Sequence, residues 1–196
     1  MNRSTALGVA LATLCPSALA LPQADRFGPQ NVLDPAADGA QSIVSADLDG
    51  DGDLDVLAAS LAGATTVNWY ANDGTGAFGP AQPISSAEFA LSVFASDLDG
   101  DGDLDVLVAS ALDNSVSWYT NAGPGLFGPA QFITFGGAAV AAADVDGDGD
   151  QDVVSASGSD VGWHANDGTG LFGARQAVDP AIESVWGLEL ADMDGD

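Results

Sequence analysis

Asp47-Leu48-Asp49-Gly50-Asp51-Gly52-Asp53-Leu54-Asp55 is the stretch of sequence that decides the fold. Carboxylates stand at every second position, and glycines stand between them, so the chain can turn sharply and gather oxygen atoms around one hard cation. The stretch recurs at Asp97–Asp105 and Asp144–Asp152, and a further copy begins at Asp192. The copies start 50, 47 and 48 residues apart. Such a period is typical of architectures in which each repeat is one supersecondary unit.

Short apolar runs surround each acidic loop in the same order. In the first repeat they cover 42–46, 56–60 and 67–70, and a last run follows the turn 72–76 and the pair Phe78-Gly79. Runs of about five residues, rich in Val, Trp and Tyr and bounded by Gly, Asn and Asp, are typical of β-strands joined by tight turns. No stretch has helical periodicity. We therefore expect an all-β fold, a partial β-propeller of about three and a half four-stranded antiparallel blades.

Two further markers set the limits of the repeats. A tryptophan recurs in the third run of each repeat and is expected to pack between neighbouring blades; the three are Trp69, Trp118 and Trp163. A Phe-Gly pair recurs with the same period and is taken as the start of each repeat. The repeat region 21–196 is thus divided at about 27–77, 78–126, 127–171 and 172–196, the last incomplete.

The N-terminus has the pattern of a secretory signal peptide over residues 1–20. Arg3 supplies a positive charge, residues 6–14 form a short apolar core, and Ala18-Leu19-Ala20 fits a small-residue cleavage site. The only cysteine, Cys15, lies within this segment, so the mature chain is expected to have no disulfide. We expect a secreted or extracellular protein, or a periplasmic or cell-surface one in a bacterium, without membrane insertion.

Charge excludes one class of partner. The net charge is -26, from 29 acids against three arginines and no lysine, and most of the acids lie in the repeated loops. A chain with so few cations cannot neutralise phosphates, so no nucleic-acid binding is expected. A hydrophobic fraction of 46% favours a folded chain. Bound divalent cations would relieve the repulsion among the acids.

Calcium is the cation that the loops predict, at about three structural sites. Calcium takes six to eight oxygen ligands in flexible geometry, whereas magnesium prefers rigid octahedra and zinc prefers Cys and His. An EF-hand is excluded by strand flanks and by the absence of a glutamate at position 12 of the loop. In the first loop we expect side-chain oxygens from positions 1, 3, 5 and 9, a backbone carbonyl from position 7, and a sharp turn at Gly52. The candidate metal ligands are Asp47, Asp49, Asp51, Asp53 and Asp55, then Asp97, Asp99, Asp101, Asp103 and Asp105, then Asp144, Asp146, Asp148, Asp150 and Asp152.

No catalytic or cofactor-binding residue is predicted, and the protein is not expected to be an enzyme. The single histidine, His164, replaces Tyr70 and Tyr119 in its column and is interpreted as a surface or packing variant. Glu189 interrupts an otherwise apolar column that includes Val44. No nucleophile motif is present.

The chain resembles the FG-GAP/VCBS repeat family, which includes the N-terminal propeller of integrin α-chains. The resemblance rests on the acidic loops, on their period and on the motifs Phe78-Gly79-Pro80 and Phe127-Gly128-Pro129. Phe172-Gly173-Ala174 departs from the motif. The resemblance implies a calcium-stabilised propeller of about seven blades, whose loops connect strands within a blade. We therefore expect a fragment of a larger propeller, the rest of which is missing from this chain. The expected function is a structural or recognition module for adhesion or ligand binding, with an unknown protein or glycan as partner. The alternative is a catalytic or non-catalytic propeller part of a carbohydrate-active enzyme such as a polysaccharide lyase.

Overall fold

The computed structural model describes residues 32–35, 37–62, 67–85, 89–158, 160–179, 185 and 187–191. The predicted signal peptide, residues 1–20, lies outside this part. Within the described residues all regular structure is strand, as the β-branched and aromatic runs predict. The strands are β1 (Asp38–Ala46), β2 (Asp55–Ala62), β3 (Val67–Tyr70), β4 (Gln82–Ser85), β5 (Ala90–Ser96), β6 (Asp105–Ser110), β7 (Ser115–Tyr119), β8 (Gln131–Phe135), β9 (Ala139–Ala143), β10 (Asp152–Ser157), β11 (Asp160–His164) and β12 (Gln176–Asp179).

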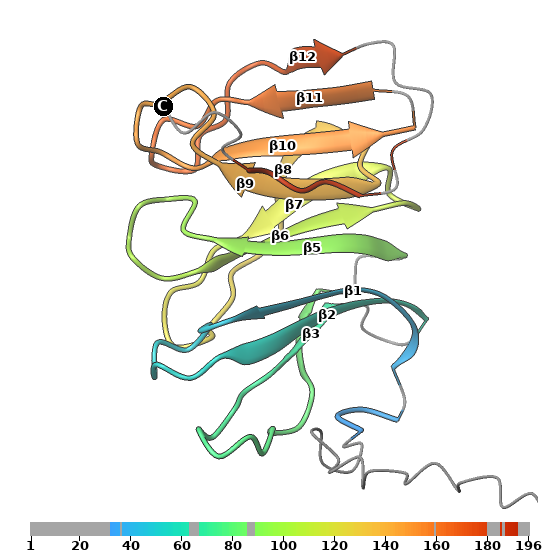
Figure 1. Ribbon diagram of the computed structural model, residues 1–196, viewed down its shortest axis with the longest axis vertical. Helices are drawn as coiled ribbons and strands as arrows, with labels where there is room; N and C mark the ends of the chain where they lie inside the picture. Colours follow the sequence, from blue (N-terminus) through green and yellow to red (C-terminus); the bar gives the residue numbers. More distant parts are fainter. Residues whose placement is uncertain are drawn as a thin grey trace, which may run out of the picture. The chain divides into compact units, whose positions relative to one another are not determined.

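The strands form three four-stranded antiparallel sheets, each made of four consecutive strands. Their orders are β1-β2-β3-β4, β5-β6-β7-β8 and β9-β10-β11-β12. The acidic loops join the first and second strands of each sheet, and a register shift interrupts the pairing of the third and fourth strands. The sheets lie one after another as propeller blades do, without closing a ring in the described part (Figure 1). The predicted all-β partial propeller is therefore confirmed.

The sheets and the Phe-Gly repeats have different phases along the chain. β4, at Gln82–Ser85, falls in the repeat 78–126 but pairs with β3 of the first sheet. β12 likewise falls in the repeat 172–196 and completes the third sheet. Beyond β12, the described residues 185 and 187–191 contain no strand. The phase differs because each Phe-Gly pair lies in the turn before the last strand of its sheet.

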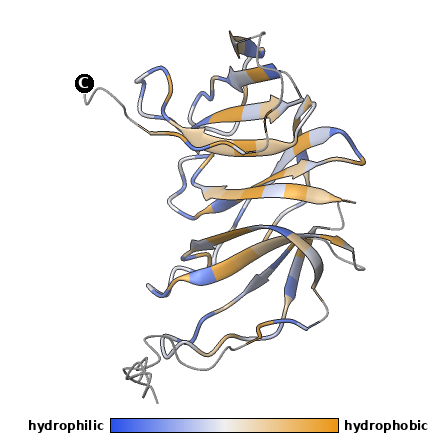
Figure 2. Cartoon of the chain, turned by 45° about the vertical axis from the view of Figure 1, so that its right-hand side comes forward, coloured by the Kyte–Doolittle hydropathy of each residue, from blue (hydrophilic) through white to orange (hydrophobic). Residues whose placement is uncertain are grey.

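The core lies between neighbouring blades, where buried apolar residues from two sheets pack together. Figure 2 shows that hydrophobic residues are frequent along the strands of these sheets. Trp69 packs edge-on against Phe127 of the second blade, with ring centroids 6.4 Å apart. Trp118 packs in the same way against Phe172 of the third blade, at 6.1 Å. This geometry adds about 0.5–1.5 kcal/mol per pair to the burial of the rings. The predicted role of the tryptophans, packing between blades, is confirmed for both.

The first strands β1, β5 and β9 lie side by side (Figure 1) and are linked by serine hydroxyls. The Val93 amide donates to the Ser42 hydroxyl at 3.3 Å, and the Val140 amide donates to the Ser92 hydroxyl at the same distance. Small residues are needed here because the strands of successive blades approach closely. The serine therefore contributes both the small volume and an acceptor for the neighbouring backbone.

Side chains on the two outer faces of this array are more exposed than their counterparts inside. Ile43 is 66% exposed, whereas Val93 at the equivalent position is 2% exposed because it packs on the first blade. At the other end, Glu189 is exposed, whereas its counterpart Val44 packs against the next blade. Glu189 thus breaks the apolar column at a face that no described blade covers.

Candidate metal centre

The backbone of each acidic loop is wound around the carboxylate of its first aspartate. Asp47 accepts hydrogen bonds from the amides of Gly50 at 2.8 Å and Gly52 at 3.0 Å. Both glycines have positive φ, 76° and 94°, a conformation in which other residues are strained. The same two bonds occur at Asp97 and Asp144. Positions 4 and 6 of the loop therefore require glycine, as the sequence indicates.

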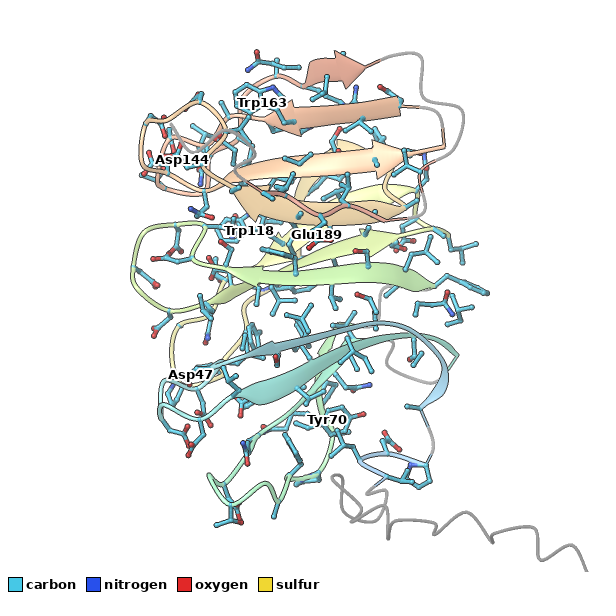
Figure 3. The ribbon with its side chains drawn as sticks, in the orientation of Figure 1. Asp47, Tyr70, Trp118, Asp144, Trp163 and Glu189 are labelled. Carbon is cyan, nitrogen blue, oxygen red and sulfur yellow. The ribbon has the colours of Figure 1, made fainter. Side chains whose placement is uncertain are left out.

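This winding brings three carboxylates of each loop close enough to share one cation. In each group one oxygen per residue lies within 4.8 Å of the others, and the groups are Asp47, Asp49 and Asp55; Asp97, Asp99 and Asp101; and Asp144, Asp146 and Asp152. The predicted ligands outside these groups are Asp51, Asp53, Asp103, Asp105, Asp148 and Asp150. Asp47 and Asp144 lie at the same side of their blades (Figure 3). Carboxylate oxygens in such clusters suit calcium.

The aspartate at position 7 turns its carboxylate away from the cluster and toward the hairpin turn of its own blade. A methyl group on Gly74 would meet the Asp53 carboxylate, and a methyl group on Gly123 would come within 2.9 Å of an Asp103 oxygen. Asp150 has the same relation to Gly168. This orientation fits the expectation that position 7 offers its backbone carbonyl rather than its side chain.

The aspartate at position 9 is buried and ties the loop to the sheet. Asp105 has no exposed surface, and its two carboxylate oxygens accept the amides of Leu98 at 2.9 Å and Asn121 at 2.7 Å. Asp55 and Asp152 make the equivalent bonds. A carboxylate oxygen has two lone pairs, so each can accept an amide and still face a cation.

Burial and mutual repulsion raise the pKa of several loop carboxyls. Burial raises the pKa of Asp105 to about 6, against the opposing effect of its two amide donors. The pKa of Asp49 is raised by burial first and then by the charges of Asp55 and Asp51. Burial and the neighbouring acids act in the same direction on Asp99 and Asp146. A divalent cation would remove this cost by supplying the missing positive charge.

An asparagine that recurs in each repeat was not singled out by the sequence as part of the site. Asn121 donates from its side-chain amide to the carbonyl of Leu48 in the first blade at 2.8 Å, and to Leu104 of its own loop at 3.1 Å. Asn166 donates in the same way to Leu98 of the second blade at 2.7 Å and to Gln151 at 3.0 Å. Each asparagine thus links two consecutive acidic loops. Its recurrence at a 49- and then 45-residue spacing from Asn72 was the available signal.

His164 is a packing residue rather than a surface one. It is 4% exposed, and its Nδ1 lies 2.9 Å from the Gly173 carbonyl. Its Nε2 is buried without a hydrogen-bond partner. Among the two interpretations offered by the sequence, packing is the one that its burial supports. The described residues include no helix with the length and hydrophobicity needed to span a membrane.

A comparison with solved structures finds matches to a lectin and to a toxin. The lectin is from Agrocybe aegerita, and its structure was determined for recognition of non-reducing terminal N-acetylglucosamine; it is 24% identical over 72% of this chain, with a TM-score of 0.52. This chain spans 41% of the lectin. The pore of the Photorhabdus luminescens Tc holotoxin is 24% identical over 71% of this chain and 7% of its own, with a TM-score of 0.43. At these identities the lectin supports the fold alone.

A search of curated proteins finds no match to the chain. The FG-GAP-like repeat, in contrast, matches three times, at residues 47–108, 97–155 and 144–196. Each match starts at the first aspartate of an acidic loop, and the first two extend to the second strand of the following blade or beyond. Together they cover the chain from Asp47 to its last residue. The chain belongs to the FG-GAP-like repeat family.

Proposed function

We propose that this chain is a secreted, calcium-stabilised recognition module, in which calcium holds the blades in shape and the surface between them meets a ligand. The observation that carries the proposal is the threefold recurrence of a carboxylate cluster on the same strand connection. The residues that would hold calcium are the predicted loop aspartates, with the position-7 residue contributing its carbonyl. Residues 1–20 would direct secretion as a signal peptide.

Calcium would supply charge compensation where the chain has none of its own. Of the three arginines in the chain, Arg175 is engaged with Asp160 at 3.0 Å, outside the loops. A cation bound in each loop would lower the electrostatic cost of folding and couple stability to calcium concentration. With a dissociation constant of about 10⁻⁴ M, 1 mM calcium would add about 1.4 kcal/mol per site to the free energy of unfolding.

The deciding experiment is a calcium titration of the mature chain by calorimetry, with thermal unfolding followed by circular dichroism in calcium, magnesium and EDTA. We expect about three sites and a calcium-dependent rise in the unfolding temperature. Asp99→Asn should remove one site and leave two, since it lowers the acceptor charge of one loop only. Binding without any gain in stability would contradict the structural role, and no binding would contradict the calcium assignment.

The ligand proposed for the recognition role is a protein or a glycan. The lectin with a similar fold recognises a sugar, and propeller blades present several surfaces between adjacent sheets. The measurement that separates the two classes is binding of immobilised glycans and of peptides to the calcium-loaded chain. The recognition role is contradicted if neither class binds under conditions in which the chain is folded.

A further inference from the structure

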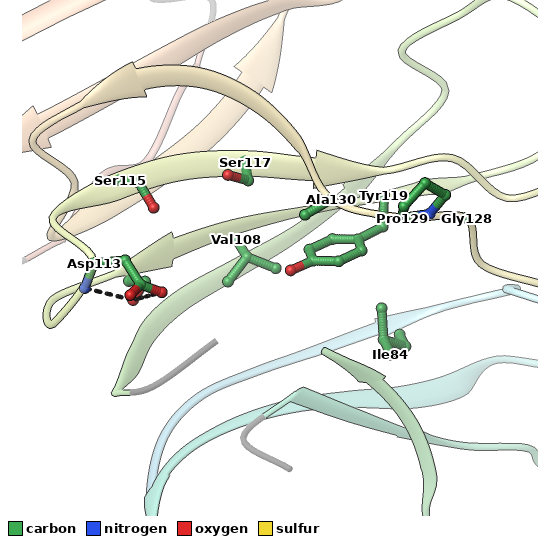
Figure 4. Close-up of a pocket in the computed structure, with 10 residues that line it drawn as sticks. Ile84, Val108, Asp113, Ser115, Ser117, Tyr119, Gly128, Pro129 and Ala130 are labelled. Atoms are coloured by element: carbon green, nitrogen blue, oxygen red, sulfur yellow. Dashed lines mark hydrogen bonds between the residues drawn. The ribbon is translucent and has the colours of Figure 1, made fainter. Parts of the chain in front are cut away.

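A polar pocket of about 400 Å³ opens on the second blade, at its boundary with the first. It is lined by the carboxylate of Asp113, the hydroxyls of Ser115 and Ser117 and the phenol of Tyr119, with Ile84 of the first blade opposite (Figure 4). Asp113 is exposed, and its backbone amide donates to Ser110 at the pocket wall. Most of these groups offer oxygen acceptors, so the pocket suits a ligand rich in hydrogen-bond donors.

At the equivalent place on the third blade lies an arginine side chain of the chain itself. Trp118 pairs with Gln131 in the second blade, as Trp163 pairs with Gln176 in the third. Ala130 and Arg175 directly precede these two glutamines, so they occupy equivalent positions in the two blades. A methyl group on Gly162 would meet the Arg175 guanidinium, so this side chain lies over the strand on that face. The Arg175 guanidinium forms an ion pair with Asp160 at 3.0 Å. The equivalent surface of the third blade therefore holds a guanidinium.

The second blade has different residues at the positions that hold the arginine side chain in the third blade. Ala130 replaces the arginine, Ser117 replaces Gly162, and Ser115 replaces Asp160. The carboxylate is retained nearby, because Asp113 lies in the turn between β6 and β7 next to Ser115. The second blade thus has acceptors in its pocket but lacks the cation that lies at the equivalent place in the third.

We propose that the pocket of the second blade binds the guanidinium group of an arginine side chain presented by a peptide or protein partner. This inference rests on the recognition role proposed above and names its ligand class. A planar guanidinium with five donors fits a pocket of one carboxylate and several hydroxyls better than an ammonium does. The net charge of -26 favours the approach of a cationic partner.

The test is a titration of the calcium-loaded chain with acetyl-Gly-Arg-Gly-amide at about 0.15 M salt, where exposed charges are screened beyond about 8 Å. The control ligands are acetyl-Gly-Lys-Gly-amide and methyl N-acetylglucosaminide. We expect one site that prefers the arginine peptide. A preference for the sugar, equal binding of the lysine peptide, or no binding would overturn the proposal.

Three variants localise the site. Ala130→Arg combined with Ser115→Asp and Ser117→Gly copies the third blade and should abolish peptide binding, because the new arginine fills the pocket. Arg175→Ala removes the guanidinium from the equivalent surface of the third blade and should raise the stoichiometry from one to two. Asp113→Asn replaces an exposed residue and should weaken binding about fivefold, the size expected for a solvated ion pair. Unchanged binding in the triple variant would show that the peptide is held by general charge and would refute the site.

The two proposals fail separately in this design. None of the pocket residues belongs to an acidic loop. Calcium binding measured on the same samples should therefore be unchanged in all three variants. Absence of peptide binding to the parent chain, with normal calcium binding, counts against the pocket alone. Absence of calcium binding to the parent chain counts against the proposed calcium role alone.

Discussion

Replacing Asn121 with alanine should destabilise the protein more than the same change at Asn72, because Asn121 links two blades and Asn72 does not. Asn121 is 1% exposed and donates to the carbonyls of Leu48 and Leu104, while its own carbonyl oxygen accepts the amide of Gly123. Each of three net hydrogen bonds contributes about 1 kcal/mol, so Asn121→Ala should cost about 3 kcal/mol.

The control is built into the repeat. The side-chain amide of Asn72 donates to Leu54 of its own loop, and its oxygen accepts the amides of Gly74 and Gly76 at 3.2 Å, in a more exposed setting. Asn72→Ala should therefore cost only about 1 kcal/mol.

Urea denaturation in saturating calcium measures both variants, and Asn166→Ala should behave like Asn121→Ala since it makes the same bond between blades. Equal losses at Asn72 and Asn121 would refute the reasoning, because the link between blades would then contribute nothing. A loss below about 0.5 kcal/mol at Asn121 would do the same, since it would mean that the Leu48 carbonyl finds another donor.

Three further predictions concern protonation, the glycine turn and the blade faces. Burial raises the pKa of Asp105 to about 6 in the folded, metal-free chain, against an ordinary value of 3.8. The folded state therefore binds the proton more tightly than the unfolded state, so the free energy of unfolding in EDTA should fall by up to about 3 kcal/mol as pH rises from about 4 to 6. An Asp105→Asn chain whose free energy of unfolding falls equally steeply with pH would contradict this assignment. Gly125→Ala should lower the free energy of unfolding, measured by urea denaturation, by about 2–4 kcal/mol, because the methyl group would meet a tryptophan ring. Gly76→Ala, where φ is also positive but nothing lies within 4 Å, should lower it by about 1 kcal/mol. Similar losses in the two variants would rule out the steric explanation. Val93→Ala should cost about 1–3 kcal/mol and Ile43→Ala less than 0.5 kcal/mol, since they are 2% and 66% exposed; a large loss at Ile43 in the thermal unfolding of the chain would mean that this face is covered in solution.

Several features of this protein follow from local sequence. The glycines at positions 4 and 6 of each loop are required by positive φ, and alternate acids are required by the winding of the loop, so both are visible in nine residues. The β-branched and aromatic runs predict strands, and a period near 48 residues predicts blades. Repetition strengthens these predictions, because each pattern occurs in three repeats of the same chain.

Other features depend on which residues meet across the fold. Asn121 and Leu48 are 73 positions apart, so no local pattern indicates their bond. The burial of Asp105, which raises its pKa, arises only when β6 is covered by neighbouring strands. The sequence alone determined the loops, the strands and their repetition, because these depend on backbone conformation over a few residues. Only the tertiary structure decided that the Arg175 guanidinium lies over Gly162 and beside Asp160, because that outcome depends on side chains from separate strands meeting in space.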